Sequence, residues 1–292
     1  MRGILHGLCA GLALLFGLGA PASALTILLT NDDGFHAPGI LAMQGALRDA
    51  GHRVIVVAPR TDQSGSSVKI TTTAFALKQE APDVWVVDGS PADSVWVGLR
   101  RVLRDAPPDL VVSGGNRGQN LGAVTNLSGT VGAAVMAALN DVPAIAVSVG
   151  IDLAEAAAGF PSTAAAYPAA GAFTAQLVAR LAASRNDGPL LPPRTVLNVN
   201  YPARPAADVR PARWTRLGAE LGYAADYVDG DGADTVKLAF GPDPNPYAAN
   251  NPHDTARFAA GHVTVTVLQA DWLAPRAVRV ETMRRVGDLV RP

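Results

Sequence analysis

The feature that most constrains the fold is an alternation of short apolar runs with stretches of helical periodicity. Residues 25–30 (LTILLT) form an apolar, β-branched run typical of a buried strand. In residues 38–51 (PGILAMQGALRDAG), Pro38 suits a first helical turn, apolar residues recur at helical spacing, and Gly51 ends the pattern. Residues 52–59 (HRVIVVAP) form a second buried strand. Strand, helix and strand within about thirty residues predict the βαβ unit of a parallel sheet.

The same alternation continues along the chain. Further strands are predicted at residues 83–89, 108–116, 143–150 and 195–202, and further helices at residues 91–103, 128–140 and 164–184. This order predicts an α/β fold, a Rossmann-like, doubly wound and mostly parallel sheet.

The amino-acid composition changes after residue 202. The stretch from about residue 203 is rich in Gly, Pro, Asn and Asp, which is typical of long loops or an extended hairpin. Residues 262–272 (HVTVTVLQADW) then alternate as a half-buried strand does. We therefore expect one domain over residues 25–292, with a core at about 25–202 and a loop- and hairpin-rich C-terminal extension at about 203–292. The extension is a candidate for a projecting subdomain or an oligomer contact.

Residues 1–24 are typical of a secretory signal peptide. Arg2 precedes an apolar run that ends in Ala22-Ser23-Ala24, a pattern that predicts cleavage after Ala24. The alternative is a membrane anchor, but the run is short for a span of about 20 apolar residues. We therefore expect export to the periplasm without a stable membrane anchor, or a cytoplasmic protein if the segment is not processed. The single cysteine, Cys9, lies in this segment, so the core rather than disulfides must stabilise the exported chain.

The formal net charge of the chain is −1. A charge this small provides no basic field for a nucleic-acid polymer. A small phosphorylated ligand needs no such field.

Polar motifs follow several of the predicted strands. Asp32 and Asp33 follow the first strand, Ser64 lies in DQSGSS after the second, and Asn116 lies in SGGNRGQN after residues 108–112. Because the carboxyl ends of parallel strands meet at one edge of the sheet, we expect these side chains to converge. Carboxylate, hydroxyl and amide oxygens predict one divalent cation per subunit, Mg²⁺ or Mn²⁺ with Ca²⁺ as a third candidate. Read alone, Asn-Asp-Asp-Gly is also common turn chemistry.

A phosphate site is predicted beside the cation. Gly115 lets backbone N–H groups approach an anion closely, and Ser128, Gly129 and Thr130 stand at the start of a helix, where N–H groups and the helix dipole favour phosphate. We add Asn31, which precedes the two aspartates. The alternative is an ordinary helix start with Ser128 as its N-cap. Arg117 is equally consistent with an anion clamp and with a surface charge.

Seven segments occur in the order seen in one known family. They are ILLTNDDGFHAPGI, VVAPRTDQSGSS, GSPADSV, VVSGGNRGQNLG, SGTVGAA, PAIAVS and LNVNYP. The chain resembles the SurE (survival protein E) nucleotidases over most of residues 25–202. The resemblance implies a metal-dependent phosphatase acting on nucleoside 5′- and 3′-monophosphates, with a Rossmann-like core and a homodimer or homotetramer formed through the C-terminal extension. It implies the metal ligands Asp32, Asp33, Ser64 and Asn116, of which we assign catalytic roles to Asp32, Asp33 and Asn116.

The chain departs from the family pattern at several positions around the expected substrate. Val68 stands where the family often has histidine, Ser94 where it has cysteine, and Leu127 where it has tyrosine. Ala123 and Val124 replace residues that are commonly acidic. These departures concern base preference and efficiency, whereas the four metal ligands are intact.

The expected mechanism is attack by a water that the cation activates. Asp32 is followed directly by Asp33, unlike the D-x-D arrangement of phosphatases that form an aspartyl phosphate, so water attack is favoured over a covalent intermediate. Two alternatives stay open: a broad acid phosphatase or polyphosphatase, and a non-catalytic periplasmic protein that binds nucleotide or phosphate.

Overall fold

The computed structural model describes residues 24–185, 188–221, 224–241, 251–271 and 273–286. Apart from Ala24, the predicted signal peptide lies outside the described residues. Within the described ranges, no helix is both long and apolar enough to cross a bilayer.

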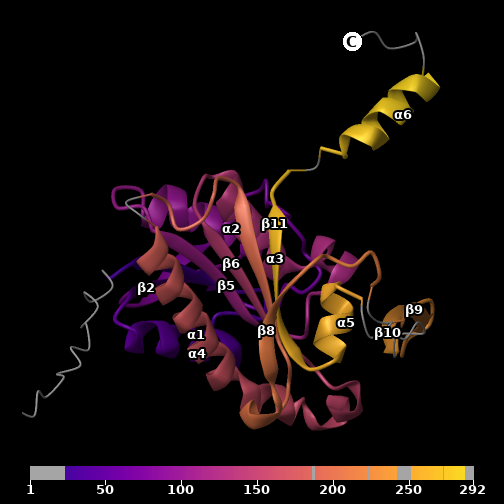
Figure 1. Ribbon diagram of the computed structural model, residues 1–292. Coiled ribbons are helices and arrows are strands. Elements are labelled where there is room, and N and C mark those ends of the chain that lie inside the picture. The colour runs from indigo at the N-terminus through magenta and orange to yellow at the C-terminus, as the bar shows by residue number, and fades with distance from the viewer. Residues whose placement is uncertain (1–23, 186–187, 222–223, 242–250, 272, 287–292) are drawn as a thin grey trace, which may run out of the picture.

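The described chain is built around a nine-stranded sheet (Figure 1). Across the sheet the strand order is β3-β4-β2-β1-β5-β6-β7-β11-β8. The six strands from β4 to β7 are parallel, whereas β3 pairs antiparallel with β4, and β11 pairs antiparallel with β7. The strands are β1 (Thr26–Thr30), β2 (Arg53–Pro59), β3 (Leu77–Ala81), β4 (Val84–Val87), β5 (Leu110–Arg117), β6 (Ala144–Val149), β7 (Thr195–Tyr201), β8 (Arg210–Thr215) and β11 (His262–Gln269).

Helices cover both faces of the sheet. On one face α1 (Pro38–Asp49) packs against α4 (Pro161–Ser184), and on the other α2 (Pro91–Val97) packs against α3 (Gly129–Leu139). A separate antiparallel hairpin comprises β9 (Ala224–Asp229) and β10 (Val236–Gly241). Two further helices are α5 (Asp254–Ala259) and α6 (Arg276–Val286), and short helical turns lie at Gly98–Val102, Gly122–Asn126, Leu153–Ala158 and Ala206–Asp208. The predicted doubly wound α/β fold is confirmed.

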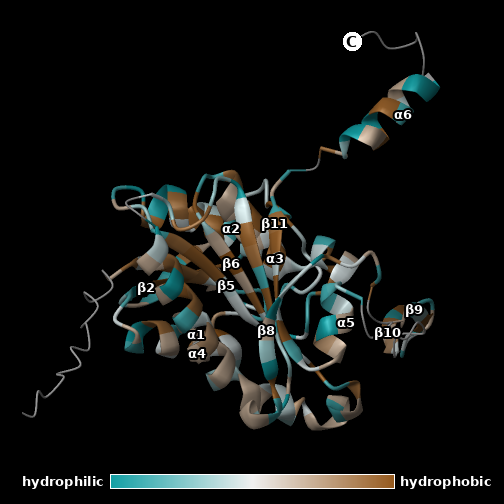
Figure 2. Ribbon diagram, in the orientation of Figure 1, coloured by the Kyte–Doolittle hydropathy of each residue, from teal (hydrophilic) through white to brown (hydrophobic). Residues whose placement is uncertain are grey.

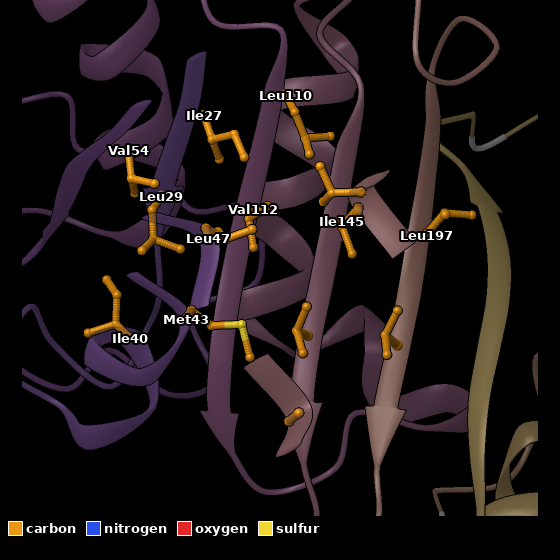
Figure 3. Close-up of a cluster of buried hydrophobic side chains, with 14 of the residues drawn as sticks. Ile27, Leu29, Ile40, Met43, Leu47, Val54, Leu110, Val112, Ile145 and Leu197 are labelled. Atoms are coloured by element: carbon orange, nitrogen blue, oxygen red, sulfur yellow. The ribbon is translucent and has the colours of Figure 1, made fainter. Parts of the chain in front are cut away.

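Two hydrophobic clusters lie on opposite faces of the sheet. Ile27 and Leu29 of β1 pack with Met43 of α1 in one cluster (Figure 3). Leu28, between them in sequence, packs with Val95 of α2 in the other cluster. Because successive strand residues face opposite sides and both sides are covered, the central strands are apolar throughout, as the continuous brown strands of Figure 2 show.

The strand order reverses at β1. The chain runs from β1 outward to β2 and β4 on one side, and later fills β5, β6 and β7 on the other. In open parallel sheets, ligands bind outside the carboxyl ends of the strands at such a reversal. Asp32 and Asp33 follow β1, and Asn116 is the second-last residue of β5. These three predicted ligands therefore lie at the reversal of strand order.

The structure departs from the sequence predictions in detail. The helix predicted at residues 91–103 ends as an α-helix at Val97 and continues as a π-helix over Gly98–Val102. Strands β8 and β11 belong to the predicted C-terminal extension, yet both pair in the main sheet. The hairpin and α6 are the parts of the extension that project from the sheet (Figure 1).

Candidate metal and phosphate site

Three of the four predicted metal ligands line one pocket. Asp32, Ser64 and Asn116 border a cavity of about 460 Å³ together with Ser128 at the start of α3. Asp33 does not line this cavity, but its Oδ2 accepts a hydrogen bond of 2.9 Å from the backbone amide of Arg117, the residue after Asn116. The ends of β1 and β5 and the start of α3 therefore bring the predicted residues together.

Asp32 is the most buried of these groups, with 3% of its surface exposed. Its Oδ1 accepts a hydrogen bond from the hydroxyl of Thr130, and a Cβ added at Gly129 would lie 3.0 Å from its Oδ2. Burial raises the pKa of Asp32 to about 7, the Thr130 hydrogen bond opposes this, and the charge of Asp33 adds to it. A carboxylate that is costly to ionise in this way is relieved by a cation placed against it.

Asn116 lines the pocket, and its side-chain amide is hydrogen-bonded through the nitrogen. Its Nδ2 donates to the carbonyl oxygen of Gly118 at 2.7 Å, which leaves Oδ1 as the atom available to a ligand. Beside it, burial also raises the pKa of Asp33, against the stabilising effect of the Arg117 amide.

Ser64 is carried by a loop that is tied to the end of β1. The amide of Gln63 donates to the carbonyl oxygen of Asp32 at 2.7 Å, and the amide of Ser64 donates to Asp62 Oδ1 at 2.8 Å. The hydroxyl of Ser64 has no hydrogen-bond partner among the described residues. It is thus an available oxygen at the rim of the pocket.

The available atoms fit a hard cation. They are carboxylate, hydroxyl and amide oxygens, the donors that Mg²⁺ and Mn²⁺ prefer. Over the described ranges, no cluster of three or more His, Cys, Asp or Glu side chains could hold a metal, so a soft or histidine-rich site is not formed there. The pocket provides the carboxylate of Asp32 and the neutral oxygens of Ser64 and Asn116, and the carboxylate of Asp33 lies next to that of Asp32 in sequence.

A buried asparagine network supports the loop after β5. The amide of Asn120 donates to Asn200 Oδ1 at 2.7 Å, and Asn120 Nδ2 donates to Ser148 Oγ at 2.9 Å. Asn198 and Asn200 of β7 both donate to the carbonyl oxygen of Asn120, at 2.8 and 3.1 Å. This network explains why β7 carries two polar residues, in LNVNYP, at fully buried positions.

The structure places some of the predicted phosphate-binding residues at the pocket and others away from it. Ser128 lines the pocket and caps α3 by accepting from the amide of Val131 at 3.1 Å. The hydroxyl of Thr130 donates to Asp32 Oδ1, and a Cβ added at Gly129 would lie 3.0 Å from Asp32 Oδ2, so the first residues of α3 lie beside that carboxylate. Asn31 and Gly115 do not line the pocket: Asn31 Nδ2 donates to the carbonyl oxygen of Gly34, and Gly115 lies against Gly39 of α1.

Arg117 lines the pocket but also pairs with Asp62. Its guanidinium lies 3.5 Å from Asp62 Oδ2 and is half exposed. It is therefore near enough to an anion in the pocket to attract it, while it stabilises the loop that carries Ser64.

Part of the pocket is not predicted from the sequence. Gln119 and Asn120 line it, and their place in the SGGNRGQN motif is the signal that points to them. Ile151, Leu153, Leu238 and Phe240 also line it, and no local pattern indicated this because they come from distant segments. Of the departures from the family pattern, Val124 and Leu127 line the pocket, whereas Val68 and Ser94 do not.

The geometry agrees with comparisons of the sequence with known proteins. The model of the family described as Survival protein SurE matches residues 27–223. The chain belongs to the SurE family. The match spans β1 to the residues before β9 and so includes every predicted site residue.

Several relatives carry the name 5′-nucleotidase SurE. One from Rhizorhabdus wittichii is 36% identical over 264 residues, which cover 88% of this chain and 98% of the relative. One from Anaeromyxobacter sp. strain Fw109-5 is 43% identical over 206 residues, covering 70% and 73%. Among solved structures, the SurE protein from Aquifex aeolicus matches with a TM-score of 0.72 and 29% identity, over 89% of this chain and 99% of that one.

Proposed function

We propose that this SurE family member is a metal-dependent 5′-nucleotidase that hydrolyses nucleoside 5′- and 3′-monophosphates to nucleoside and phosphate. The observation that carries the proposal is the gathering of Asp32, Ser64 and Asn116 in one pocket at the reversal of strand order. The names of the relatives, 5′-nucleotidase SurE, support the substrate class.

Each residue of the pocket has a distinct task in the proposed reaction. A divalent cation, when bound, supplies Lewis acidity toward the phosphate ester and lowers the pKa of a water nucleophile. Thr130 orients the Asp32 carboxylate, and the Gly118 carbonyl orients the Asn116 amide so that its oxygen is presented. Ser128 and the start of α3 favour negative charge at the mouth of the pocket.

The surroundings of Asp32 support direct water attack over a covalent aspartyl intermediate. Its Oδ1 already accepts from Thr130, and a Cβ added at Gly129 would lie 3.0 Å from its Oδ2. A buried carboxylate with one oxygen already hydrogen-bonded has little freedom to attack phosphorus, so we assign it to cation binding.

Phosphate release by the purified protein tests the proposal. We expect EDTA to abolish release from nucleoside 5′- and 3′-monophosphates and Mg²⁺ or Mn²⁺ to restore it, because the proposed reaction depends on the Lewis acidity that the cation supplies. Release from p-nitrophenyl phosphate or polyphosphate but not from nucleotides would instead indicate a general phosphatase or polyphosphatase. Nucleotide binding without turnover under any metal would indicate a binding protein.

We also propose that the chain forms a homodimer or homotetramer through the C-terminal extension. The segment after β11 leaves Leu273, Val278, Val280 and Met283 exposed, and α6 extends away from the sheet (Figure 1). We expect sedimentation to give the mass of a dimer or tetramer for the full chain, and a smaller species for a chain truncated after Asp271. A monomeric full chain would contradict this proposal.

A further inference from the structure

The pocket that contains the predicted metal ligands has a second, apolar lining. Leu238 and Phe240 come from β10, Leu127 follows the helical turn at Gly122–Asn126, and Ile151 and Leu153 follow β6. These residues line the same cavity of about 460 Å³ as Asp32, Ser64 and Asn116. The volume lies in the range of about 300–1,000 Å³ typical of small-molecule sites, so a phosphate group alone would leave most of it empty.

Several of these apolar residues are exposed to solvent. Leu127 and Phe240 are each 53% exposed and Leu238 is 47% exposed. Leu238 and Phe240 are two residues apart on one strand, so both side chains leave the hairpin on the same face. Exposed apolar side chains from three separate segments that meet in one pocket indicate a ligand with an apolar face.

Each polar side chain beside this lining has one amide atom engaged within the protein. Gln119 Oε1 accepts from the amide of Ile151 at 3.0 Å. Asn120 Nδ2 donates to Ser148, and the backbone of Asn120 bonds to Asn198 and Asn200. A planar group held against the apolar side chains is contacted through its faces, which all nucleobases share.

We propose that Leu238 and Phe240 of the hairpin, with Leu127 and Leu153, form an apolar shelf that binds the nucleobase of the substrate by its face and without selecting its identity. The inference rests on the proposed nucleotidase function. It assigns the β9–β10 hairpin a role in substrate affinity, with the phosphate held at the other, polar lining of the pocket.

The test compares substrates with and without a base. Wild type and Phe240→Ala are assayed with adenosine 5′-monophosphate, cytidine 5′-monophosphate and ribose 5-phosphate. We expect kcat/KM for both nucleotides to fall about tenfold or more through KM, since stacking of a base on an aromatic ring is lost. Ribose 5-phosphate, which has no base, should be hydrolysed unchanged. Phe240→Trp keeps an aromatic face and should retain nucleotide turnover.

Val236→Ala is the matched control. Val236 lies on the same strand and face as Leu238 and Phe240, is 67% exposed, and does not line the pocket. We expect it to leave all three substrates unaffected.

Three results would overturn the proposal. If kcat/KM of Phe240→Ala fell equally for ribose 5-phosphate and the nucleotides, Phe240 would have only a structural role. Unchanged kcat/KM for the nucleotides would exclude the shelf. A fall in kcat/KM for only one of the two nucleotides would contradict binding without base selection. If wild type hydrolyses none of the substrates, the nucleotidase function itself fails. In that case the shelf is tested by calorimetric measurement of the binding of the two nucleotides and ribose 5-phosphate. The proposal requires that Phe240→Ala binds the nucleotides more weakly than wild type and binds ribose 5-phosphate equally well.

Discussion

Replacing Asp32 or Asp33 with Asn is expected to lower kcat/KM for nucleoside monophosphates by roughly a thousandfold or more, as loss of a catalytic group does. Asn has nearly the same shape as Asp but no negative charge, so the fold is kept while the charge that holds the cation is lost. The measurement is metal-restored phosphate release. Near-normal activity of either variant would show that the carboxylate in question is not a ligand.

Asp88→Asn is the matched control for charge. Asp88 follows β4 at the same edge of the sheet, pairs with Arg60 on the surface, and does not line the pocket. A surface ion pair contributes little to stability, so this variant should keep wild-type activity.

The Asp32 variant also has an expected signature in stability. Without metal, the pKa of Asp32 is raised from 3.8 to about 7 by folding. At a pH between these values, Asp32 is ionised in the unfolded chain and protonated in the folded chain. The free energy of unfolding therefore has its full contribution from Asp32 below pH 3.8 and loses it as pH rises to about 7. The metal-free Asp32→Asn variant has no ionisable group at this position and does not lose stability in this way. It should therefore melt above metal-free wild type at pH 8 and lose that advantage toward pH 4, which calorimetry in EDTA measures.

The convergence of Asp32, Ser64 and Asn116 could be predicted from the sequence largely because of the sheet topology. Once residues 25–30 and 108–112 are recognised as parallel strands, the residues that follow them must meet at one edge, and Asp32 and Asn116 do. Sequence reasoning failed where a contact depends on distant segments. Nothing in the residues around Leu238 or Phe240 indicates that they reach the same pocket. Gly115 was assigned to phosphate on conformational grounds, but its neighbour in the structure is α1.

For the fold as well, some elements could be predicted from the sequence and others could not. The central strands were readable because both of their faces are buried, which requires continuous apolar runs. Strand β3 reads LKQEA and is mostly exposed, and β8 reads RPARWT and is exposed over nearly its whole length. Edge strands of this kind form because a neighbour offers backbone hydrogen bonds, and charge on them prevents pairing with other chains. Their own side chains therefore carry little strand signal.

Gly39→Ala is expected to destabilise the protein by about 1–3 kcal/mol or more and to lower its activity as well. A Cβ at Gly39 would lie 1.8 Å from the carbonyl oxygen of Gly115 and 2.9 Å from Tyr167 Cε1. Because the first of these is a backbone atom, either α1 or the end of β5 must move. Asn116 follows Gly115 directly, so the displacement reaches a predicted metal ligand. Urea denaturation and kcat/KM measure the two effects.

Gly45→Ala in the same helix separates this clash from the general effect of removing a glycine. Gly45 is exposed and has no atom within 4 Å of an added Cβ, so alanine there should stabilise the protein by about 0.5–1 kcal/mol through helix propensity alone. If Gly39→Ala behaved like Gly45→Ala, the close approach of α1 to β5 would be wrong. If the two variants diverge as expected, glycine at position 39 is required because the first turn of α1 must reach the strand end that carries Asn116. The βαβ unit that forms the fold would then also set the position of a residue of the site.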